Sequence, residues 1–485
     1  MVTTTLIGCN IIDGDDTVAA NAQLVDRFGP ADGTLAGQRV ESGAAEIDQA
    51  LAAARAGQAA WAATTPVFRG ELLRAIAREL DARIETLAHL VHLETGKSLA
   101  MARGEVRGAI ELAYFTAAEG RRFYGRTTTS AIPGKQVSTW RAPIGVGALI
   151  AASNTPVPNY AWKVFPALLA GNSVILKPSE HTPFSAVEFV RICLDCGVPA
   201  SALQLIQGSG PGTGSTLVES KIELVSFTGS AAVGRGILAS AGGRLIRAAV
   251  ELGGKNAMIV CDDADLSAAA DAAVASAFSN AGQRCAATSR IIVMGSVYEE
   301  FTRLLLERTS ALTLHGQDDS VGPVIGEIAV ARITAAVSGA AERGATLLAG
   351  GPDSVPGSLA GGCFVAPTIL ADVPADDPIS VEEVFGPVAN LYRVGSFAEA
   401  IALAAQTEYG LTGAIWTDSV DRAFHFTSTA RVGMAVVNGP TFGSEPHMPF
   451  GGFGSSGNGT RECGTEVFDF YTELRTVAVL TREPR

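Results

Sequence analysis

The sequence has little that would suit a membrane, an export signal or a nucleic-acid partner. Only 6% of its 485 residues are aromatic and 18% are charged, and the net charge is −13. An acidic surface repels nucleic acid and anionic lipid, so neither is expected as a partner. No apolar run reaches the roughly 18 residues of a membrane-spanning helix. The start, MVTTTLIGCNIIDGDD, lacks the basic region of a signal peptide. We therefore expect a cytoplasmic protein.

Cysteines are few and scattered along the chain. There are seven, an odd number at irregular spacing, which argues against a disulfide framework. Cys193 and Cys196 stand at CxxC spacing, but no second pair or histidine cluster follows them. We expect these two thiols to be buried on a helix, and we expect no metal site.

What the chain does contain is typical of an α/β enzyme. It is 47% hydrophobic with 54 glycines, and its length predicts two or three domains. Residues 46–122 carry apolar residues at three- and four-residue steps, which predicts helices. The segments 127–143 and 475–485 are rich in residues that favour strands. From Gly145 onward, short apolar strands alternate with helices, which predicts parallel, doubly wound sheets.

Two glycine-rich segments could approach a phosphate. GSGPGTG, Gly208 to Gly214, fails the G-x-G-x-x-G spacing, so we expect a flexible loop there. FTGSAAVG follows an apolar strand, and Gly229 and Ser230 stand where a helix begins. Free N–H groups and a hydroxyl at that place suit a phosphate, although they also suit ordinary helix capping.

Four further residues carry chemistry that the local sequence leaves open. Lys177 and Glu180 follow a strand and could bind ribose hydroxyls or form a surface ion pair. Glu251 is the only charge in AAVELGG, so it could be a buried base with a raised pKa or a carboxylate facing water. Cys285, in NAGQRCAATSR, could be a core thiol, a metal ligand or a nucleophile.

Taken together, the motifs resemble those of the aldehyde dehydrogenase superfamily. ELGGKN, FTGS with VG, NAGQRC, EEVFGPV, TEYGL and MPFGG with SG occur in the order and at the separations of that family, from about Ile47 onward. The resemblance implies an α/β fold with two doubly wound Rossmann-type domains and a small β oligomerisation element. The implied limits are 1–123 and 144–253 for the coenzyme-binding domain, 254–467 for the catalytic domain, and 124–143 with 468–485 for the oligomerisation strands.

The resemblance also implies a role for individual residues. Cys285 would attack the aldehyde to give a thiohemiacetal and then a thioester. The Asn154 amide and the Cys285 N–H would stabilise the oxyanion, and Glu251 would activate water to release the acid. The implied cofactor contacts are Lys177 and Glu180 on the adenosine ribose, Gly229 and Ser230 near the pyrophosphate, Glu383 on the nicotinamide ribose and Phe385 beside the nicotinamide ring.

The chain departs from the family around the oxyanion asparagine. Where the family carries aromatic residues on both sides, this chain has Ser153 and Thr155, so no aromatic side chain is expected beside the substrate there. We therefore expect a more polar pocket and a polar substrate, a semialdehyde or a functionalised aromatic aldehyde. The pocket residues implied by the resemblance are Thr155, Asn159, Trp162, Arg284, His447 and Phe450; whether Arg284 faces the pocket stays open.

The cofactor and the competing functions depend on a few of these residues. Glu180 would accept hydrogen bonds from a free 2′-hydroxyl and repel a 2′-phosphate, so we expect NAD, with NADP disfavoured but allowed. A CoA-acylating enzyme is an alternative, but such members typically lack the glutamate at position 251. A Cys–His hydrolase would need a histidine beside the thiol, and only His447 is in a plausible region. A catalytically silent binding protein is a further alternative.

A homodimer or homotetramer that shares a sheet between subunits is expected.

Overall fold

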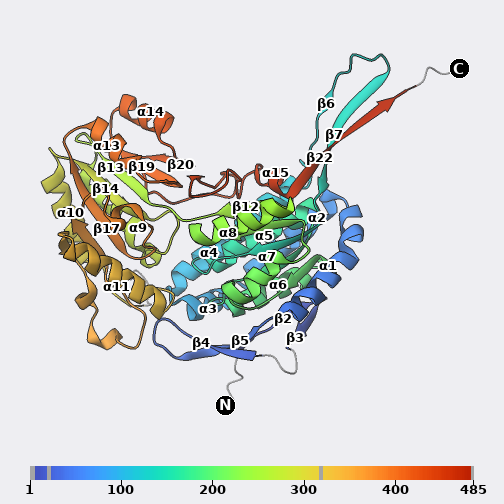
Figure 1. Cartoon of the computed structure of the whole chain (residues 1–485), viewed down its shortest axis with the longest axis horizontal. Helices are drawn as coiled ribbons and strands as arrows, with labels where there is room; N and C mark the ends of the chain where they lie inside the picture. The colour runs from blue at the N-terminus through green and yellow to red at the C-terminus, as the bar shows by residue number, and fades with distance from the viewer. Residues whose placement is uncertain (1–5, 19–22, 316–320, 482–485) are drawn as a thin grey trace.

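The computed structural model describes residues 6–18, 23–315 and 321–481, which form two lobes and a projecting arm (Figure 1). Within them are 22 strands and 15 α-helices. The last four residues of the predicted C-terminal strand segment lie outside the described residues.

Four helices lie between the N-terminal strands and β7 (Lys135–Pro143), as the apolar spacing predicted. Thr65 caps one helix ahead of Pro66, and the Ser98 hydroxyl accepts from the Met101 N–H at 3.2 Å. Gly96 ends the third helix with a φ of 71°, a conformation that favours glycine. The helices are α1 (Ala44–Ala63), α2 (Pro66–Ala82), α3 (Ile84–Thr95) and α4 (Leu99–Glu119).

The first lobe is built on a seven-stranded sheet. Its order is β12 (Arg247–Glu251), β11 (Leu224–Thr228), β8 (Val146–Ile150), β9 (Ser173–Lys177), β10 (Leu203–Leu205), β2 (Asn10–Ile12) and β3 (Asp15–Thr17). β12 to β10 run parallel, and the two edge strands are antiparallel. The helices that follow these strands are α5 (Pro156–Ala170), α6 (Pro183–Asp195), α7 (Ser215–Glu219) and α8 (Ala231–Arg244).

Both faces of this sheet are buried, which explains why its strands read as continuous apolar runs. Along β8, Val146, Ala148 and Ile150 pack in one cluster with residues of α1, α7 and α8. Leu149 packs in the opposite cluster, with residues of α5 and α6. The prediction of an α/β fold with a doubly wound sheet is confirmed.

The prediction of a flexible loop at GSGPGTG was wrong. Gly210–Gly214 forms a π-helical turn that runs directly into α7. Its start is fixed by Ser209, whose hydroxyl accepts from the Gly212 N–H at 3.2 Å and donates to Glu41 at 2.7 Å. Glycine content alone did not reveal this cap.

The prediction that both thiols of the CxxC segment are buried on a helix holds only in part. Cys193 is buried on α6, but Cys196 caps that helix and is partly exposed.

The second lobe holds another seven-stranded sheet, parallel except for one edge strand. Its order is β15 (Thr346–Ala349), β16 (Thr368–Ala371), β17 (Val388–Val394), β14 (Thr288–Met294), β13 (Asn256–Val260), β19 (Thr412–Trp416) and β20 (Met434–Val437). Its helices are α9 (Leu266–Phe278), α10 (Tyr298–Ser310), α11 (Glu327–Glu342), α12 (Pro378–Val381), α13 (Phe397–Ala404) and α14 (Val420–Thr429).

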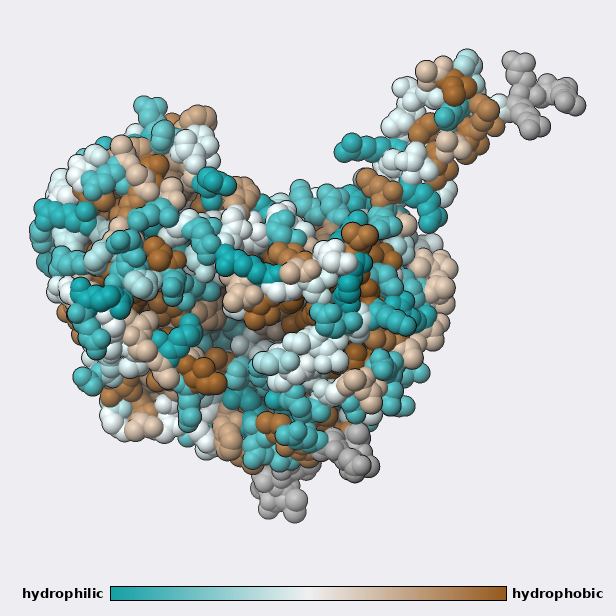
Figure 2. Space-filling model, in the orientation of Figure 1, coloured by the Kyte–Doolittle hydropathy of each residue, from teal (hydrophilic) through white to brown (hydrophobic). Residues whose placement is uncertain are grey.

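The arm is a three-stranded antiparallel sheet that leaves the first lobe (Figure 1). It consists of β22 (Thr472–Leu480), β7 (Lys135–Pro143) and β6 (Thr127–Thr128), and it follows the short helix α15 (Val467–Tyr471). Figure 2 shows hydrophobic surface along it, and Trp140, Leu474 and Leu480 are exposed apolar side chains there. The smaller sheets join β1 (Leu6–Gly8), β5 (Leu35–Glu41) and β4 (Gln23–Phe28), and β18 (Tyr409–Gly410) with β21 (Phe453–Gly454).

The two large sheets meet end to end. Glu251 closes β12 at the carboxyl edge of the first sheet, and the chain then enters β13 at the amino edge of the second sheet. The domain limits given above stay a prediction.

In the described part of the chain, no helix is long and apolar enough to cross a membrane.

Candidate active site

The switch point of the first sheet determines where the predicted residues gather. From β8, strands β9 and β10 extend the sheet in one direction, and β11 and β12 extend it in the other. Ligands of doubly wound sheets bind at the carboxyl ends of strands beside such a reversal. The segments that leave these strand ends carry Asn154 after β8, Lys177 at β9, Ser230 after β11 and Glu251 at β12.

A strained turn presents Cys285 at the amino end of β14. After α9, Asn280 and Ala281 adopt φ values of 55° and 53°, which side chains other than glycine rarely adopt. Gly282 follows with a φ of 67°, and a Cβ on it would lie 2.1 Å from the Gly386 carbonyl oxygen. The turn therefore requires a glycine at this position. It leaves the Cys285 side chain half-buried at the wall of a cavity.

The cavity beside Cys285 has a volume of about 440 Å³. It brings together Asn154 and Cys285 with four of the predicted pocket residues, Thr155, Trp162, Arg284 and Phe450. Aromatic rings line it too, and two of them belong to the predicted pocket residues Trp162 and Phe450. Trp162 and Phe450 pack with ring centroids 5.2 Å apart, and Phe442 also contributes to the wall. These rings come from other segments of the chain, so the lack of aromatic residues on both sides of Asn154 did not remove the aromatic wall of the cavity.

Asn154 is held firmly through its main chain and its side chain. Its carbonyl oxygen accepts from the Lys97 ammonium at 2.7 Å and from Asn280 Nδ2 at 3.0 Å. Its own Nδ2 donates to the Gln283 carbonyl oxygen at 3.0 Å. An amide nitrogen carries two hydrogens, so one remains for an oxyanion formed beside Cys285.

Burial of the thiol favours the protonated form of Cys285. Desolvation raises its pKa to about 12, and the carboxylates of Glu383 and Glu251 act in the same direction. The Ala286 N–H and the Arg284 guanidinium oppose this shift in pKa. A thiol of this kind reacts only if its proton is removed as it attacks.

Glu251 is a buried carboxyl group and does not face water, so the alternative of a solvent-facing glutamate was wrong. It is 3% exposed, and within the described residues neither carboxyl oxygen has a hydrogen-bond partner. Burial, followed by repulsion from Glu462, raises its pKa well above the ordinary value. Glu462 itself forms a buried ion pair with Lys163, whose ammonium also donates to Ser226 Oγ at 2.9 Å.

Lys177 is also buried, which rules out the surface ion pair. It is 1% exposed, and its ammonium donates to the Pro178 carbonyl oxygen at 2.9 Å. Burial lowers its pKa to about 8, against the attraction of Glu180. Glu180 is partly exposed, three residues beyond the end of β9. The two side chains therefore stand near one strand end without forming an ion pair.

The other predicted cofactor residues lie on both sides of the junction. Ser230 is exposed and caps α8, and its hydroxyl accepts from the Val233 N–H at 3.5 Å. Gly229 donates its N–H to the Glu251 carbonyl oxygen at 3.1 Å. Glu383 accepts from the Gly254 N–H at 3.0 Å, and burial raises its pKa. Phe385 adopts a φ of 51° and borders the same small cleft as Glu383.

Arg284 lines the Cys285 cavity. Its guanidinium lies over the Phe442 ring, 5.1 Å from the centroid. In the described part of the chain it makes no hydrogen bond or ion pair, and its buried Nε has no partner. Burial lowers its pKa, while the nearby Glu105 opposes that shift. A partly buried cation without a hydrogen-bond or ion-pair partner suits an anionic ligand group.

Asn159 and His447 do not line the cavity. Asn159 donates from Nδ2 to the Thr155 carbonyl oxygen at 2.8 Å and to Thr155 Oγ1 at 3.0 Å, so it supports a pocket residue from behind. The His447 side chain is 60% exposed, with Nδ1 3.8 Å from Glu445 Oε2. In the described residues no histidine lines the cavity with Cys285, so the geometry of a Cys–His hydrolase is missing.

Sequence reasoning missed the buried charges behind the cavity. Lys97 pairs with Glu105 at 2.6 Å, and both side chains line the cavity wall. Lys163 lies inside an apolar helical run, and a single charge in such a run could have predicted a buried lysine with a charged partner. Within the described residues, no group of three or more His, Cys, Asp or Glu side chains could hold a metal ion.

Comparisons with known proteins agree with this arrangement. The model of the aldehyde dehydrogenase family matches residues 17–477. The chain is 34% identical over 475 residues to the alpha-ketoglutaric semialdehyde dehydrogenase of Bacillus subtilis strain 168, with 97% of each chain covered. It is 36% identical over 473 residues to the NADP(+) succinate-semialdehyde dehydrogenase of Escherichia coli K12, again with 97% of each covered.

A solved structure shows the same fold. Betaine aldehyde dehydrogenase from Staphylococcus aureus, in complex with NAD+, superposes with a TM-score of 0.95 at 31% identity. The match covers 99% of this chain and 96% of that one. The prediction of two Rossmann-type α/β units with an added β element is thus confirmed at the level of the whole fold.

Proposed function

The chain belongs to the aldehyde dehydrogenase family, and we propose that it oxidises a carboxylate-bearing aldehyde, a semialdehyde, to the acid with NAD. The observation that carries the substrate class is Arg284, an unpaired guanidinium in the wall of the Cys285 cavity. The aldehyde would lie at Cys285 and the tail carboxylate at Arg284. Both relatives compared above act, by their names, on semialdehydes.

In the first half of the reaction, the Cys285 sulfur attacks the aldehyde carbon. The oxyanion that develops is stabilised by the second hydrogen of the Asn154 amide and by the Cys285 N–H. The thiol proton passes to solvent water during the attack, because the pKa of the thiol lies near 12 and the sulfur must be a thiolate to bond to carbon. NAD, when bound, supplies the acceptor for the hydride that leaves the thiohemiacetal carbon.

In the second half, water attacks the thioester on Cys285. Glu251 takes the proton of that water, and the oxyanion returns to the same two donors. A raised pKa suits this role, since a carboxylate with a higher pKa is a stronger base. Breakdown of the tetrahedral adduct releases the acid and the Cys285 thiolate.

The residues present suit a dinucleotide. Lys177 and Glu180 stand at the end of β9, Ser230 at the start of α8 and Glu383 at the edge of the second sheet. A carboxylate at Glu180 favours a free 2′-hydroxyl over a 2′-phosphate. We therefore infer NAD as the preferred cofactor, although one relative uses NADP.

One assay tests the proposal directly. Succinic semialdehyde, a longer semialdehyde and the matched alkanals are offered with NAD and with NADP, without CoA, and absorbance at about 340 nm reports the reduced cofactor. We expect oxidation of semialdehydes with NAD to be fastest. Cys285→Ala should abolish it. Alkanals as clearly better substrates would contradict the substrate class.

The same assay, repeated with CoA added, separates the other candidate functions. A strict requirement for CoA would indicate the acylating reaction, which leaves the Glu251 base without a role. A lack of activity in both wild type and Cys285→Ala would indicate a binding protein without this chemistry. Acid formation without reduced cofactor would contradict an oxidation.

We also infer a homo-oligomer, a dimer or a tetramer. Within the described residues, β20 ends the second sheet with an unpaired edge, and the arm carries exposed apolar side chains on β7 and β22. Unpaired edges and apolar patches favour association with a second chain. Light scattering on the wild type and on Leu474→Asp tests this, and a monomer in both would contradict it.

A further inference from the structure

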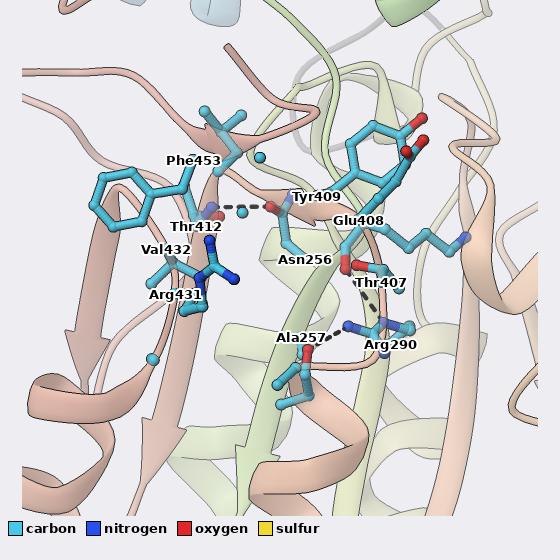
Figure 3. Close-up of a pocket in the computed structure, with 18 of the residues that line it drawn as sticks. Asn256, Ala257, Arg290, Thr407, Glu408, Tyr409, Thr412, Arg431, Val432 and Phe453 are labelled. Atoms are coloured by element: carbon cyan, nitrogen blue, oxygen red, sulfur yellow. Dashed lines mark hydrogen bonds between the residues drawn. The ribbon is translucent and has the colours of Figure 1, made fainter. Parts of the chain in front are cut away.

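Asn256 stands at the amino end of β13, between the Cys285 turn and a separate cavity of the second lobe. That cavity has a volume of about 190 Å³, and Asn256 lines it but does not line the Cys285 cavity. Asn256 is 3% exposed. Figure 3 shows it beside Thr412, with the hydrogen bond between the two dashed. Asn256 therefore lies outside the cavity in which the substrate would lie.

The Asn256 amide is committed to the turn that carries the nucleophile. Its Nδ2 donates to the Cys285 carbonyl oxygen at 2.7 Å and to the Ala287 carbonyl oxygen at 2.8 Å. Its Oδ1 accepts from the Thr412 N–H at 3.1 Å, which anchors the amide to β19. An amide nitrogen has two hydrogens, so both donors of Asn256 are used on this turn.

An irregularity in the strand pairing lets Asn256 reach the turn. The register between β13 and β14 shifts between Asn256 and Ala257. Such irregularities re-aim a side chain at the edge of a regular ladder. A Cβ on Gly254 would lie 2.7 Å both from the Cys285 carbonyl oxygen and from Asn256 Oδ1. The close approach of these two groups therefore requires a glycine at position 254.

A second side chain holds the carbonyl group between these two. Thr441 is fully buried, and its Oγ1 donates to the Ala286 carbonyl oxygen at 2.6 Å. Within the turn, the Ala287 N–H donates to the Arg284 carbonyl oxygen at 3.0 Å. Four consecutive carbonyl groups, those of residues 284–287, thus have a fixed direction.

The direction of a carbonyl group also determines where the N–H of the same peptide points. In a trans peptide, the C=O and the N–H point in opposite directions. The Cys285 carbonyl oxygen is held by Asn256. The Ala286 N–H belongs to the same peptide, and it acts on the Cys285 sulfur from the other side. The hydrogen bond from Asn256 therefore aims this N–H at the sulfur.

The remaining groups around the sulfur act without such a dependence on direction. Burial raises the pKa of the Cys285 thiol, and the carboxylates of Glu383 and Glu251 add to that shift. The Arg284 guanidinium acts in the opposite direction through its charge. A hydrogen bond weakens steeply when its angle is lost, so turning the peptide would remove the contribution of the Ala286 N–H and leave the charges in place.

We propose that Asn256 is a positioning residue of the reaction, which holds the Cys285 carbonyl oxygen, directs the Ala286 N–H at the sulfur and so stabilises the thiolate that attacks the aldehyde. The inference rests on the proposed function for what the thiolate attacks, but not for the properties of the thiol itself. Hydrogen bonds to a charged acceptor are stronger than those between neutral groups, so one N–H suffices for a measurable effect.

The test is alkylation of Cys285 by iodoacetamide in wild type and in Asn256→Leu, without aldehyde, at a series of pH values. Mass spectrometry of the peptide that carries Cys285 gives the rate. Leucine has nearly the size of asparagine but cannot donate to the turn. Because the thiolate is the reacting form, loss of the N–H bond should slow alkylation about threefold to tenfold at each pH. An unchanged rate would overturn the proposal.

Thr441→Val is the matched control. It also leaves a carbonyl group of the turn without its donor, but not that of the peptide to which the Ala286 N–H belongs. We expect both variants to lower Tm and only Asn256→Leu to slow alkylation. Equal slowing in both would mean a general loosening of the turn and would overturn the role of Asn256.

A bulkier reagent separates thiolate stability from access to the thiol. N-ethylmaleimide should be slowed in Asn256→Leu by about the same factor as iodoacetamide, because both reagents need the thiolate. A much larger factor for N-ethylmaleimide would indicate a narrowed cavity and contradict the proposal.

A second variant keeps the test decisive if Asn256→Leu does not fold. Asn256→Asp keeps the shape of the side chain and the bond from the Thr412 N–H, but an ionised carboxylate has no hydrogen to donate. It should slow alkylation at least as much, since its charge also disfavours the thiolate. Unchanged alkylation in Asn256→Asp would overturn the proposal.

The outcome is distinct from that of the proposed function. A wild type that oxidises no aldehyde, together with slowed alkylation in Asn256→Leu, would refute the function and support the role of Asn256. A wild type that oxidises semialdehydes, together with unchanged alkylation in the variant, would refute this inference alone.

Discussion

The Lys97 ammonium donates one hydrogen bond to the Asn154 carbonyl oxygen at 2.7 Å and another to Glu105 Oε2 at 2.6 Å. Glu105 in turn accepts from the Val157 N–H at 3.1 Å, in the first turn of α5. The buried pair thus ties α4 to the main chain on both sides of Thr155. The Lys97–Glu105 ion pair therefore positions the oxyanion donor Asn154 but takes no part in making or breaking bonds.

Lys97→Met should lower kcat with less effect on KM, because the amide of Asn154 would move while the substrate contacts remain. A displaced catalytic donor can cost about tenfold to a hundredfold. Steady-state kinetics measure the split, with exposed Lys221→Met as the matched control. In the Asn154→Ala background the same change should have little further effect. A full additional loss there would contradict a positioning role.

Glu251→Gln should leave a burst of about one reduced cofactor per active site and then slow turnover, because acylation does not need the base. In the wild type, the raised pKa of Glu251 means that the base form increases as pH rises past the ordinary range of a carboxyl group, so kcat should increase with pH there. Stopped-flow absorbance separates the two phases. A variant without any burst would place Glu251 in the first half of the reaction.

The same substitution should stabilise the protein at alkaline pH. Folding raises the pKa of the Glu251 carboxyl group, so its ionised form is less favourable in the folded state than in the unfolded state. The free energy of unfolding therefore declines as pH rises from the ordinary carboxyl pKa toward the raised one. Glu251→Gln removes that decline, and its Tm at pH 8 should exceed that of the wild type. An equal or lower Tm would indicate that the carboxylate has a partner in solution.

Arg284→Met should discriminate between substrates with and without a tail carboxylate. Loss of a charge-assisted contact should lower kcat/KM for succinic semialdehyde about tenfold to a hundredfold and leave butanal nearly unchanged. The two aldehydes share a four-carbon chain, so butanal is the matched control. Equal losses for both would mean that Arg284 supports the Cys285 turn and does not bind the substrate.

Glu180→Ala should weaken the preference for NAD. Without the carboxylate, repulsion of the 2′-phosphate disappears, and kcat/KM for NADP should rise about tenfold relative to that for NAD. The ratio of the two values in wild type and variant is the measurement. A wild type that already favours NADP tenfold would refute the role given to Glu180.

Cofactor binding should weaken as pH rises through 8. Burial lowers the pKa of Lys177 to about 8, so its ammonium is present below that pH and lost above it. The KM for NAD should therefore increase between pH 7 and 9 in the wild type and be high but flat in Lys177→Met. A wild-type KM that does not change over this range would separate Lys177 from the cofactor.

Much of the fold was readable from local patterns. The apolar spacing of residues 46–122 predicted α1 to α4, and the short apolar runs after Gly145 predicted the parallel strands, since burial on both faces of a sheet leaves that pattern. The turn Gly210–Gly214 was missed because its cap depends on Glu41, a residue 168 positions away from Ser209.

The sequence by itself determined which reactive groups the chain carries: the Cys285 thiol, the isolated Glu251 and the Asn154 amide stand in motifs whose order identifies them. Only the tertiary structure decided what surrounds them. It turned Arg284 into the cavity, left His447 outside, and buried Lys163 against Glu462, 299 positions later. The reason is physical: pKa values and pocket polarity depend on burial and on neighbours from distant segments, and no local spacing encodes those contacts.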